Sequence, residues 1–140
     1  TVIDHIPAGL GVTLISILNA MSGESIVTMG ARLPSKKLGK KDIVKIENRE
    51  LTPDEINQIC LVAPKASINI IRNNQVHKKL RVAMPNSLQK IARCPNAKCI
   101  TNHEAMSTKF NLLDGKEKYF ACQYCEKQFT PSELAEKIVA

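Results

Sequence analysis

The chain has 140 residues, which is enough for one ordinary domain or two small ones. Twenty Lys and Arg residues against thirteen Asp and Glu residues give a net charge of +7, and this excess favours anionic partners. No apolar run approaches the roughly 18 residues of a membrane span, and no secretory signal is recognisable. With five cysteines and no export signal, we expect a cytoplasmic protein without membrane contact.

The first 84 residues predict alternating strands and helices. Apolar residues at helical spacing indicate a helix over 10–21, and residues 34–41 form a basic loop. Strands are expected over these segments: 1–6, 25–33, 42–48, 66–72 and 75–82. With a second helix between the third and fourth strands, the order is βαββαβ plus an extra strand, the ferredoxin-like pattern of an α+β protein.

Two local signals place the second helix and the last hairpin turn of this region. Thr52 can cap the second helix, with Pro53 at its first position and Glu55 completing a capping box, and the helix should end near Val62. Asn73 and Asn74 suit a two-residue hairpin turn because Asn tolerates positive φ. The strand that follows this turn is rich in Lys and Arg, as expected of an edge strand.

Strand parity predicts a polar sheet face. If Val44, Ile46, Ile68 and Ile70 face the helices, then the residues between them face the other way: Lys45, Glu47, Asn69 and Ile71. A charged patch on an otherwise apolar sheet is a candidate ligand surface. The basic loop is either a solvated turn or a segment that steers anions. The cations of the last strand, Lys78, Lys79 and Arg81, either protect an edge strand against pairing or clamp phosphate.

Residues 82–86 look like a linker to a second, smaller domain. The remaining stretch of about 55 residues is too short to bury a secure core by itself, so a metal would have to supply much of its folding free energy. A capping box at Thr130 and Glu133 predicts a terminal helix that reaches Ile138.

Four cysteines in this second region form two pairs. Cys94 and Cys99 flank four residues, Cys122 and Cys125 flank two, and the interval between the pairs suits an antiparallel ribbon. This spacing is typical of a structural Zn²⁺ site with four thiolate ligands, which leaves no position for water or substrate. Two disulfides and a redox pair are the alternatives. His103 is read as a surface residue and Cys60 as a small core residue.

Taken together, several segments resemble a known family. The segments Thr1–Ala8, Leu33–Ser35 with Gly39–Asp42, Lys45–Asn48, Cys94–Ile100 and Cys122–Lys127 resemble the regulatory chain of aspartate carbamoyltransferase. The resemblance implies a non-catalytic allosteric subunit in pyrimidine biosynthesis. Its partners would be the catalytic chains, a second regulatory chain in a homodimer, and the effectors CTP and ATP.

The resemblance also implies domain roles and site residues. Residues 1–84 would bind the nucleotide and residues 85–140 would hold Zn²⁺ and contact the catalytic chain. The nucleotide-binding residues would be Asp4 near ribose, His5 near phosphate, Lys45 at ribose and base, Asn69, Ile71, Asn74 and Val76 around the base, and Lys79 at the triphosphate. The interface candidates beside the cysteines are Asn96, Tyr124, Glu126 and Lys127.

A nucleic-acid-binding zinc ribbon is the competing hypothesis, suggested by the positive charge and the four cysteines. Single-strand binders stack bases on aromatic platforms, and this chain has few aromatic residues near the cysteine pairs. We therefore expect no nucleic-acid partner.

Overall fold

The computed structural model describes residues 1–138 and divides the chain into two compact units. The N-terminal unit covers residues 1–83, and the C-terminal unit begins at Met84. The last two residues of the predicted second domain, 139–140, lie outside the described part. The two units are described separately below.

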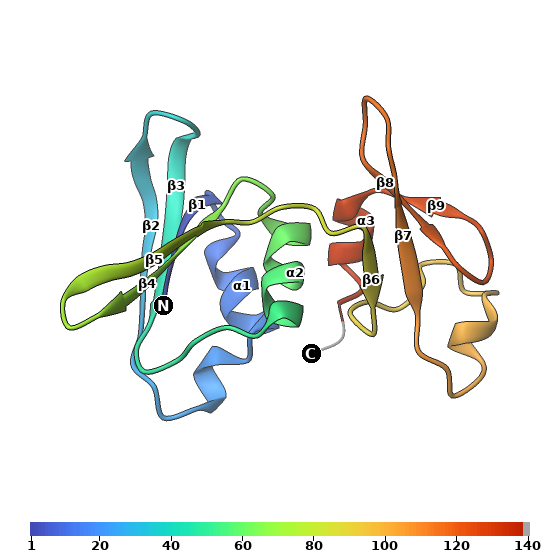
Figure 1. The fold of residues 1–140 in the computed structure, drawn as a ribbon, viewed down its shortest axis with the longest axis horizontal. Coiled ribbons are helices and arrows are strands. Elements are labelled where there is room, and N and C mark those ends of the chain that lie inside the picture. Colours follow the sequence, from blue (N-terminus) through green and yellow to red (C-terminus); the bar gives the residue numbers. More distant parts are fainter. Residues whose placement is uncertain (139–140) are drawn as a thin grey trace. The chain divides into compact units, whose positions relative to one another are not determined.

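The N-terminal unit is a five-stranded antiparallel sheet with its helices on one side (Figure 1). The sheet order β2-β3-β1-β4-β5 confirms the ferredoxin-like pattern with one added edge strand. In chain order its elements are β1 (Val2–Pro7), α1 (Gly11–Ile17), the 3-10 helix η1 (Ala20–Ser22), β2 (Val27–Ser35), β3 (Gly39–Ile46), α2 (Pro53–Val62), β4 (Ser67–Arg72) and β5 (Gln75–Arg81).

The core of this unit lies between the sheet and the helices. Ile3, Val44 and Ile68 occupy one row across β1, β3 and β4, and all are buried with Leu14 of α1 and Ile59 of α2. Cys60 is also buried, which confirms its assignment to the core. The capping box at Thr52 and Glu55 is present, and Asn73 and Asn74 take φ values of 52° and 62°, as predicted for the hairpin turn.

Two predicted elements of the N-terminal unit and the predicted facing of one residue need correction. The helix over 10–21 is wrong in length, because Asn19 at φ 53° ends it and Met21 is exposed. The basic loop over 34–41 is mostly strand, since β2 and β3 pair as far as Ser35 and Gly39. Ile70 is only half-buried, because it lies next to a bulge in the β4–β5 pairing.

Bulges interrupt the sheet on both sides of one short segment of β3. His5 lies at φ 58° where the β1–β3 register shifts, and Arg32 lies at φ 57° where the β2–β3 register shifts. Asp42 stabilises this arrangement from the helix side, where its buried carboxylate accepts hydrogen bonds from the N–H groups of Arg32, Gly9 and Gly11 at 2.9–3.0 Å. Gly11 is required there, because a Cβ would come within 2.9 Å of Asp42 Oδ2.

The C-terminal unit is a four-stranded antiparallel sheet in the order β6-β7-β8-β9. Its elements are β6 (Ser87–Gln89), the 3-10 helix η2 (Ile100–Asn102), β7 (Lys109–Leu113), β8 (Tyr119–Cys122), β9 (Gln128–Phe129) and α3 (Pro131–Ala135). The small core holds Leu88, Phe110, Phe120, Phe129 and Leu134. The capping box at Thr130 is confirmed, but α3 ends at Ala135 because Ile138 pairs with Ala92 instead.

Candidate metal centre and ligand face

The four paired cysteines meet at one point in the C-terminal unit. Their sulfur atoms all lie within 4.8 Å of one another, with Cys94 and Cys125 at 3.7 Å and Cys99 and Cys122 at 3.8 Å. A tetrahedron with metal–sulfur bonds of about 2.3 Å has sulfur–sulfur edges of about 3.8 Å. A disulfide would require about 2.05 Å, so the geometry fits four thiolates around one tetrahedral ion.

Local hydrogen bonds prepare these sulfurs for a metal. Cys94 accepts from the N–H of Asn96, and Cys125 accepts from the N–H of Lys127 and the side chain of Asn96. Thr101 Oγ1 lies 3.2 Å from the sulfur of Cys99. Such contacts around the ligands orient them and stabilise negative charge on sulfur.

The thiols differ in how readily they ionise. Burial raises the pKa of Cys94 and of Cys122. Burial also acts to raise the pKa of Cys125, but hydrogen bonds led by the Lys127 N–H outweigh it and lower the value to about 7. Because a metal binds thiolates, binding must release protons, and metal affinity should rise with pH.

The predicted interface residues surround this cluster. Asn96 lies in the turn between the first two cysteines, Tyr124 lies between the second two, and Glu126 and Lys127 follow them. Tyr124 is 45% exposed, and Glu126 adopts φ 65° with its N–H donated to the Cys122 carbonyl at 3.0 Å. His103 is exposed and its Nε2 lies 2.9 Å from the Ala97 carbonyl, so it supports the first cysteine turn from the surface.

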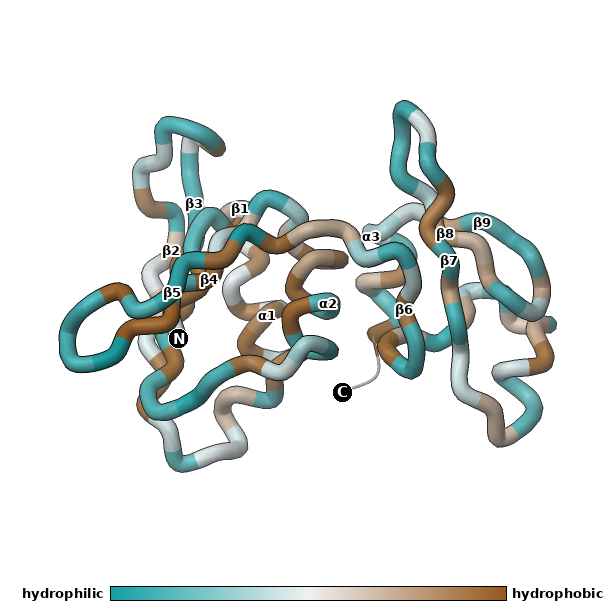
Figure 2. The backbone as a smooth tube through the Cα atoms, in the orientation of Figure 1, coloured by the Kyte–Doolittle hydropathy of each residue, from teal (hydrophilic) through white to brown (hydrophobic). Residues whose placement is uncertain are grey.

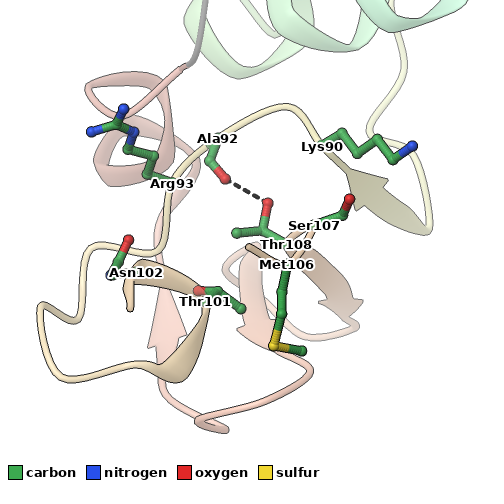
Figure 3. Close-up of a pocket in the computed structure, with 8 residues that line it drawn as sticks. All are labelled: Lys90, Ala92, Arg93, Thr101, Asn102, Met106, Ser107 and Thr108. Atoms are coloured by element: carbon green, nitrogen blue, oxygen red, sulfur yellow. Dashed lines mark hydrogen bonds between the residues drawn. The ribbon is translucent and has the colours of Figure 1, made fainter. Parts of the chain in front are cut away.

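A pocket of about 440 Å³ lies beside this centre in the C-terminal unit (Figure 3). Two of its polar side chains bond to the backbone: Thr108 Oγ1 donates to the Ala92 carbonyl at 2.6 Å, and Asn102 Nδ2 donates to the Cys94 carbonyl at 3.0 Å. Lys90 and Arg93 extend in opposite directions and do not converge on a ligand position. Asn102, which lines the pocket, therefore supports the first cysteine turn through its bond to Cys94.

The sheet face opposite the helices of the N-terminal unit, called the open face below, carries a row that is polar apart from Val2 and is called the polar row below. Direct pairing places Lys45 beside Val2, Val2 beside Asn69, and Asn69 beside Lys79, across β3, β1, β4 and β5. None of these four residues is buried. The parity argument from the sequence placed Lys45 and Asn69 on one face, and the register has them there.

Two pockets lie at the two ends of this row. One, of about 360 Å³, has the predicted residues Lys45, Ile71 and Asn74 in its lining, together with Val2 and other residues. The other, of about 380 Å³, has the predicted residues His5 and Lys79. Along β1, Val2 and His5 are three residues apart, which is about 10 Å at the rise of a strand.

The remaining predicted site residues lie close by. Asp4 forms an ion pair with Lys41 at 2.9 Å, while His5 Nδ1 lies 3.1 Å from Ser67 Oγ. Burial acts to raise the pKa of Asp4, but the hydrogen bond from Lys41 and further contacts lower it overall. Val76 pairs with Ile71 and is exposed. Three further cations line the His5 pocket, namely Lys37, Lys65 and Arg81. The sequence marked Arg81 as a possible phosphate clamp and Lys37 as part of the basic loop, but it gave no role to Lys65.

Comparison with known proteins identifies the family. Residues 1–83 match the aspartate carbamoyltransferase regulatory chain, allosteric domain, and residues 86–135 match the metal binding domain of the same chain. The chain belongs to the aspartate carbamoyltransferase regulatory chain family. Membership favours the regulatory hypothesis over a nucleic-acid-binding zinc ribbon, and it makes the chain a non-catalytic subunit with an allosteric and a metal-binding domain.

Relatives of this regulatory chain are regulatory chains of several organisms. A regulatory chain of Pyrococcus abyssi is 46% identical over 136 residues, covering 96% of this chain and 90% of the relative. The Pyrococcus horikoshii chain is 45% identical with the same coverage, and that of Phocaeicola vulgatus is 44% identical over 128 residues, covering 91% and 83%. None of the helices within residues 1–138 is long and apolar enough to cross a membrane.

Proposed function

We propose that this chain binds nucleotide effectors of the CTP and ATP type on its N-terminal unit. We further propose that its C-terminal unit, folded around one structural Zn²⁺, transmits the signal to the catalytic chains of aspartate carbamoyltransferase. The observation that carries the proposal is the polar row from Lys45 to Lys79, which joins two pockets of different chemistry on the domain that matches the family's allosteric domain.

The two pockets suit the two ends of a nucleotide. The pocket at Lys45 mixes the apolar Ile71 with Asn74 and exposed backbone at the hairpin turn, which fits a base and ribose. Asn69 and Val76 extend this end of the site. The pocket at His5 and Lys79 is cationic, which fits phosphates bound by point charges and hydrogen bonds.

Asp4 would act near the ribose, and its contacts define what it can do. The carboxylate is already paired with Lys41 and accepts the His5 N–H at 2.6 Å. It therefore holds His5 in its left-handed conformation, with the imidazole directed at the pocket that also contains Lys79. A ribose hydroxyl could still donate to a free lone pair of Asp4.

The donor chemistry of the cysteine centre supports Zn²⁺ in particular. Four thiolates in a tetrahedron with no open position are the usual ligand set of structural zinc, and hard cations such as Mg²⁺ prefer oxygen ligands. When bound, the ion would supply folding free energy to the C-terminal unit and fix the turns that carry Asn96, Tyr124, Glu126 and Lys127. These exposed or half-buried residues are proposed to contact the catalytic chain.

Regulation of this kind is a coupling between sites. An effector shifts the catalytic chains only by the difference between its affinities for two states of the assembly. A homodimer of regulatory chains and a cytoplasmic location complete the proposal, the latter supported by cysteines that form no disulfide within residues 1–138.

Co-expression with the host's catalytic chains tests the proposal. The two chains should co-elute in gel filtration, and the purified complex should bind CTP and ATP. Separate elution in the presence of Zn²⁺ would contradict the proposed assembly, and a complex that binds neither nucleotide would contradict the proposed effector site.

A further inference from the structure

The cationic pocket at His5 contains more positive charge than the predicted effector residues provide. Besides His5 and Lys79, its lining includes Lys37, Lys65 and Arg81, and none of its nine lining residues is acidic. Among the ion pairs of residues 1–138, none involves any of these lysines or Arg81. Four cations without ionic partners thus share one pocket of about 380 Å³.

Lys37 and Lys65 reach this pocket from outside the sheet face. Lys37 lies in the turn between β2 and β3, which is largely hydrophilic in Figure 2, and Lys65 lies in the turn after α2. Bulges bend and twist the strands that contain them, and the β2 bulge at Arg32 is held by the buried carboxylate of Asp42. The hydrogen bond from the Arg32 N–H to Asp42 therefore lies at the base of the hairpin whose turn contains Lys37.

We propose that Lys37 and Lys65 make this pocket select effectors by their number of phosphates. This inference rests on the proposed nucleotide function. His5 and Lys79 lie on the sheet beside the polar row and hold the phosphates nearest the ribose, whereas Lys37 and Lys65, from the two flanking turns, hold the terminal phosphates.

The preference for a triphosphate over a monophosphate would follow from the match between the charge of the ligand and the charge of the pocket. A fully ionised triphosphate carries about four negative charges and a monophosphate about two. Four cations around one pocket repel one another, and a ligand with matching charge relieves more of that repulsion than a ligand with half of it. Since the lysines are exposed, each contributes by a charge-assisted hydrogen bond with partial screening.

The test uses the purified complex with the catalytic chains. Dissociation constants for CTP and CMP are measured by isothermal titration calorimetry for the wild type, Lys37→Gln and Lys65→Gln. Each variant should bind CTP about five- to tenfold more weakly and CMP less than about twofold more weakly. Inorganic tripolyphosphate should displace CTP from the wild type, and each variant should require a higher concentration of it.

Lys78→Gln is the matched control. It removes the same charge from β5, but Lys78 pairs with Ile70 and alternates with Lys79, so it lies off the open face. Both affinities should stay within about twofold of the wild type. A ratio of CTP to CMP affinity that is unchanged in both test variants would overturn the inference and show that these lysines are solvated surface residues. A wild-type complex that binds neither nucleotide would overturn the proposed function as well.

Discussion

Removal of the metal should unfold the C-terminal unit and leave the N-terminal unit folded. The perturbation is Cys122→Ala, which deletes a buried thiol whose sulfur lies 3.8 Å from that of Cys99. The backbone of Cys122 also joins β8 to the second cysteine turn through its N–H bond to the Lys127 carbonyl at 2.9 Å. Alanine keeps this backbone bond but leaves only three of the four thiolates for the metal.

The magnitude follows from the size of the unit. It has about 55 residues, and domains of that length have a free energy of unfolding of about 3–8 kcal/mol. Structural zinc contributes an apparent 10–16 kcal/mol or so at neutral pH. The free energy lost with the metal thus exceeds the whole free energy of unfolding expected for the unit. We therefore expect the buried core around Phe110 and Phe120 to be insufficient to keep the unit folded without the ion.

The chain provides a probe for this unit alone. It has two tyrosines and no tryptophan, and both tyrosines, Tyr119 and Tyr124, belong to the C-terminal unit. In a urea titration of Cys122→Ala, tyrosine fluorescence should change without a cooperative transition, while far-ultraviolet circular dichroism still reports cooperative unfolding of the N-terminal unit. Cys60→Ala is the control, because it removes a buried cysteine of α2 and leaves the metal centre intact.

A cooperative tyrosine transition near the wild-type midpoint in Cys122→Ala would refute this reasoning. It would mean that the core around Phe110 suffices for stability and that the cysteine centre is not what folds the unit. Chelation of the wild-type metal should reproduce the behaviour of Cys122→Ala.

Three further predictions concern the N-terminal unit. Asp42→Asn should lower its free energy of unfolding by about 2–4 kcal/mol in urea, since an amide cannot accept all three N–H bonds and leaves buried donors unsatisfied. Burial opposes ionisation of Asp42, but bonds from the N–H groups of Arg32, Gly11 and Gly9 lower its pKa overall. The contribution of the Asp42 carboxylate to the free energy of unfolding should therefore be full above about pH 4 and vanish as the pH falls through the lower folded-state pKa. A stability difference between wild type and Asp42→Asn that persists under strong acid would contradict this account. Thr52→Ala should cost about 1 kcal/mol by loss of the cap on α2, measured in the same titration, and no change would argue against the capping box. Lys79→Ala should weaken CTP binding in calorimetry about tenfold without dissociating the complex, and an unchanged affinity would exclude Lys79 from the site.

Short-range chemistry explains which parts of the fold could be predicted. The capping boxes at Thr52 and Thr130 and the turn at Asn73 and Asn74 depend on residues no more than three apart, so the sequence contains the whole signal. The placement of Lys45 and Asn69 on one sheet face followed from alternation along strands, which needs only the correct pairing of β1 with β3 and β4.

The missed features depend on contacts between distant segments. The bulge at Arg32 and the loop at Gly9 are held by Asp42, which lies 10 and 33 residues away along the chain. Residues 34–41 read as a loop because Pro34 and the run of lysines obscured the pairing of the end of β2 with the start of β3. Lys65 has no local mark of function and Lys37 is one of several lysines in a basic segment, so only the fold shows that both line the His5 pocket.

The central claim is that nucleotides bound to this chain control catalytic chains that it does not itself contain. The most direct measurement is the aspartate saturation curve of the reconstituted complex with and without CTP and ATP. We predict that the two nucleotides shift the half-saturating aspartate concentration, and that the shift disappears when catalytic chains are assayed alone. An intact complex whose curve neither nucleotide moves would contradict the account.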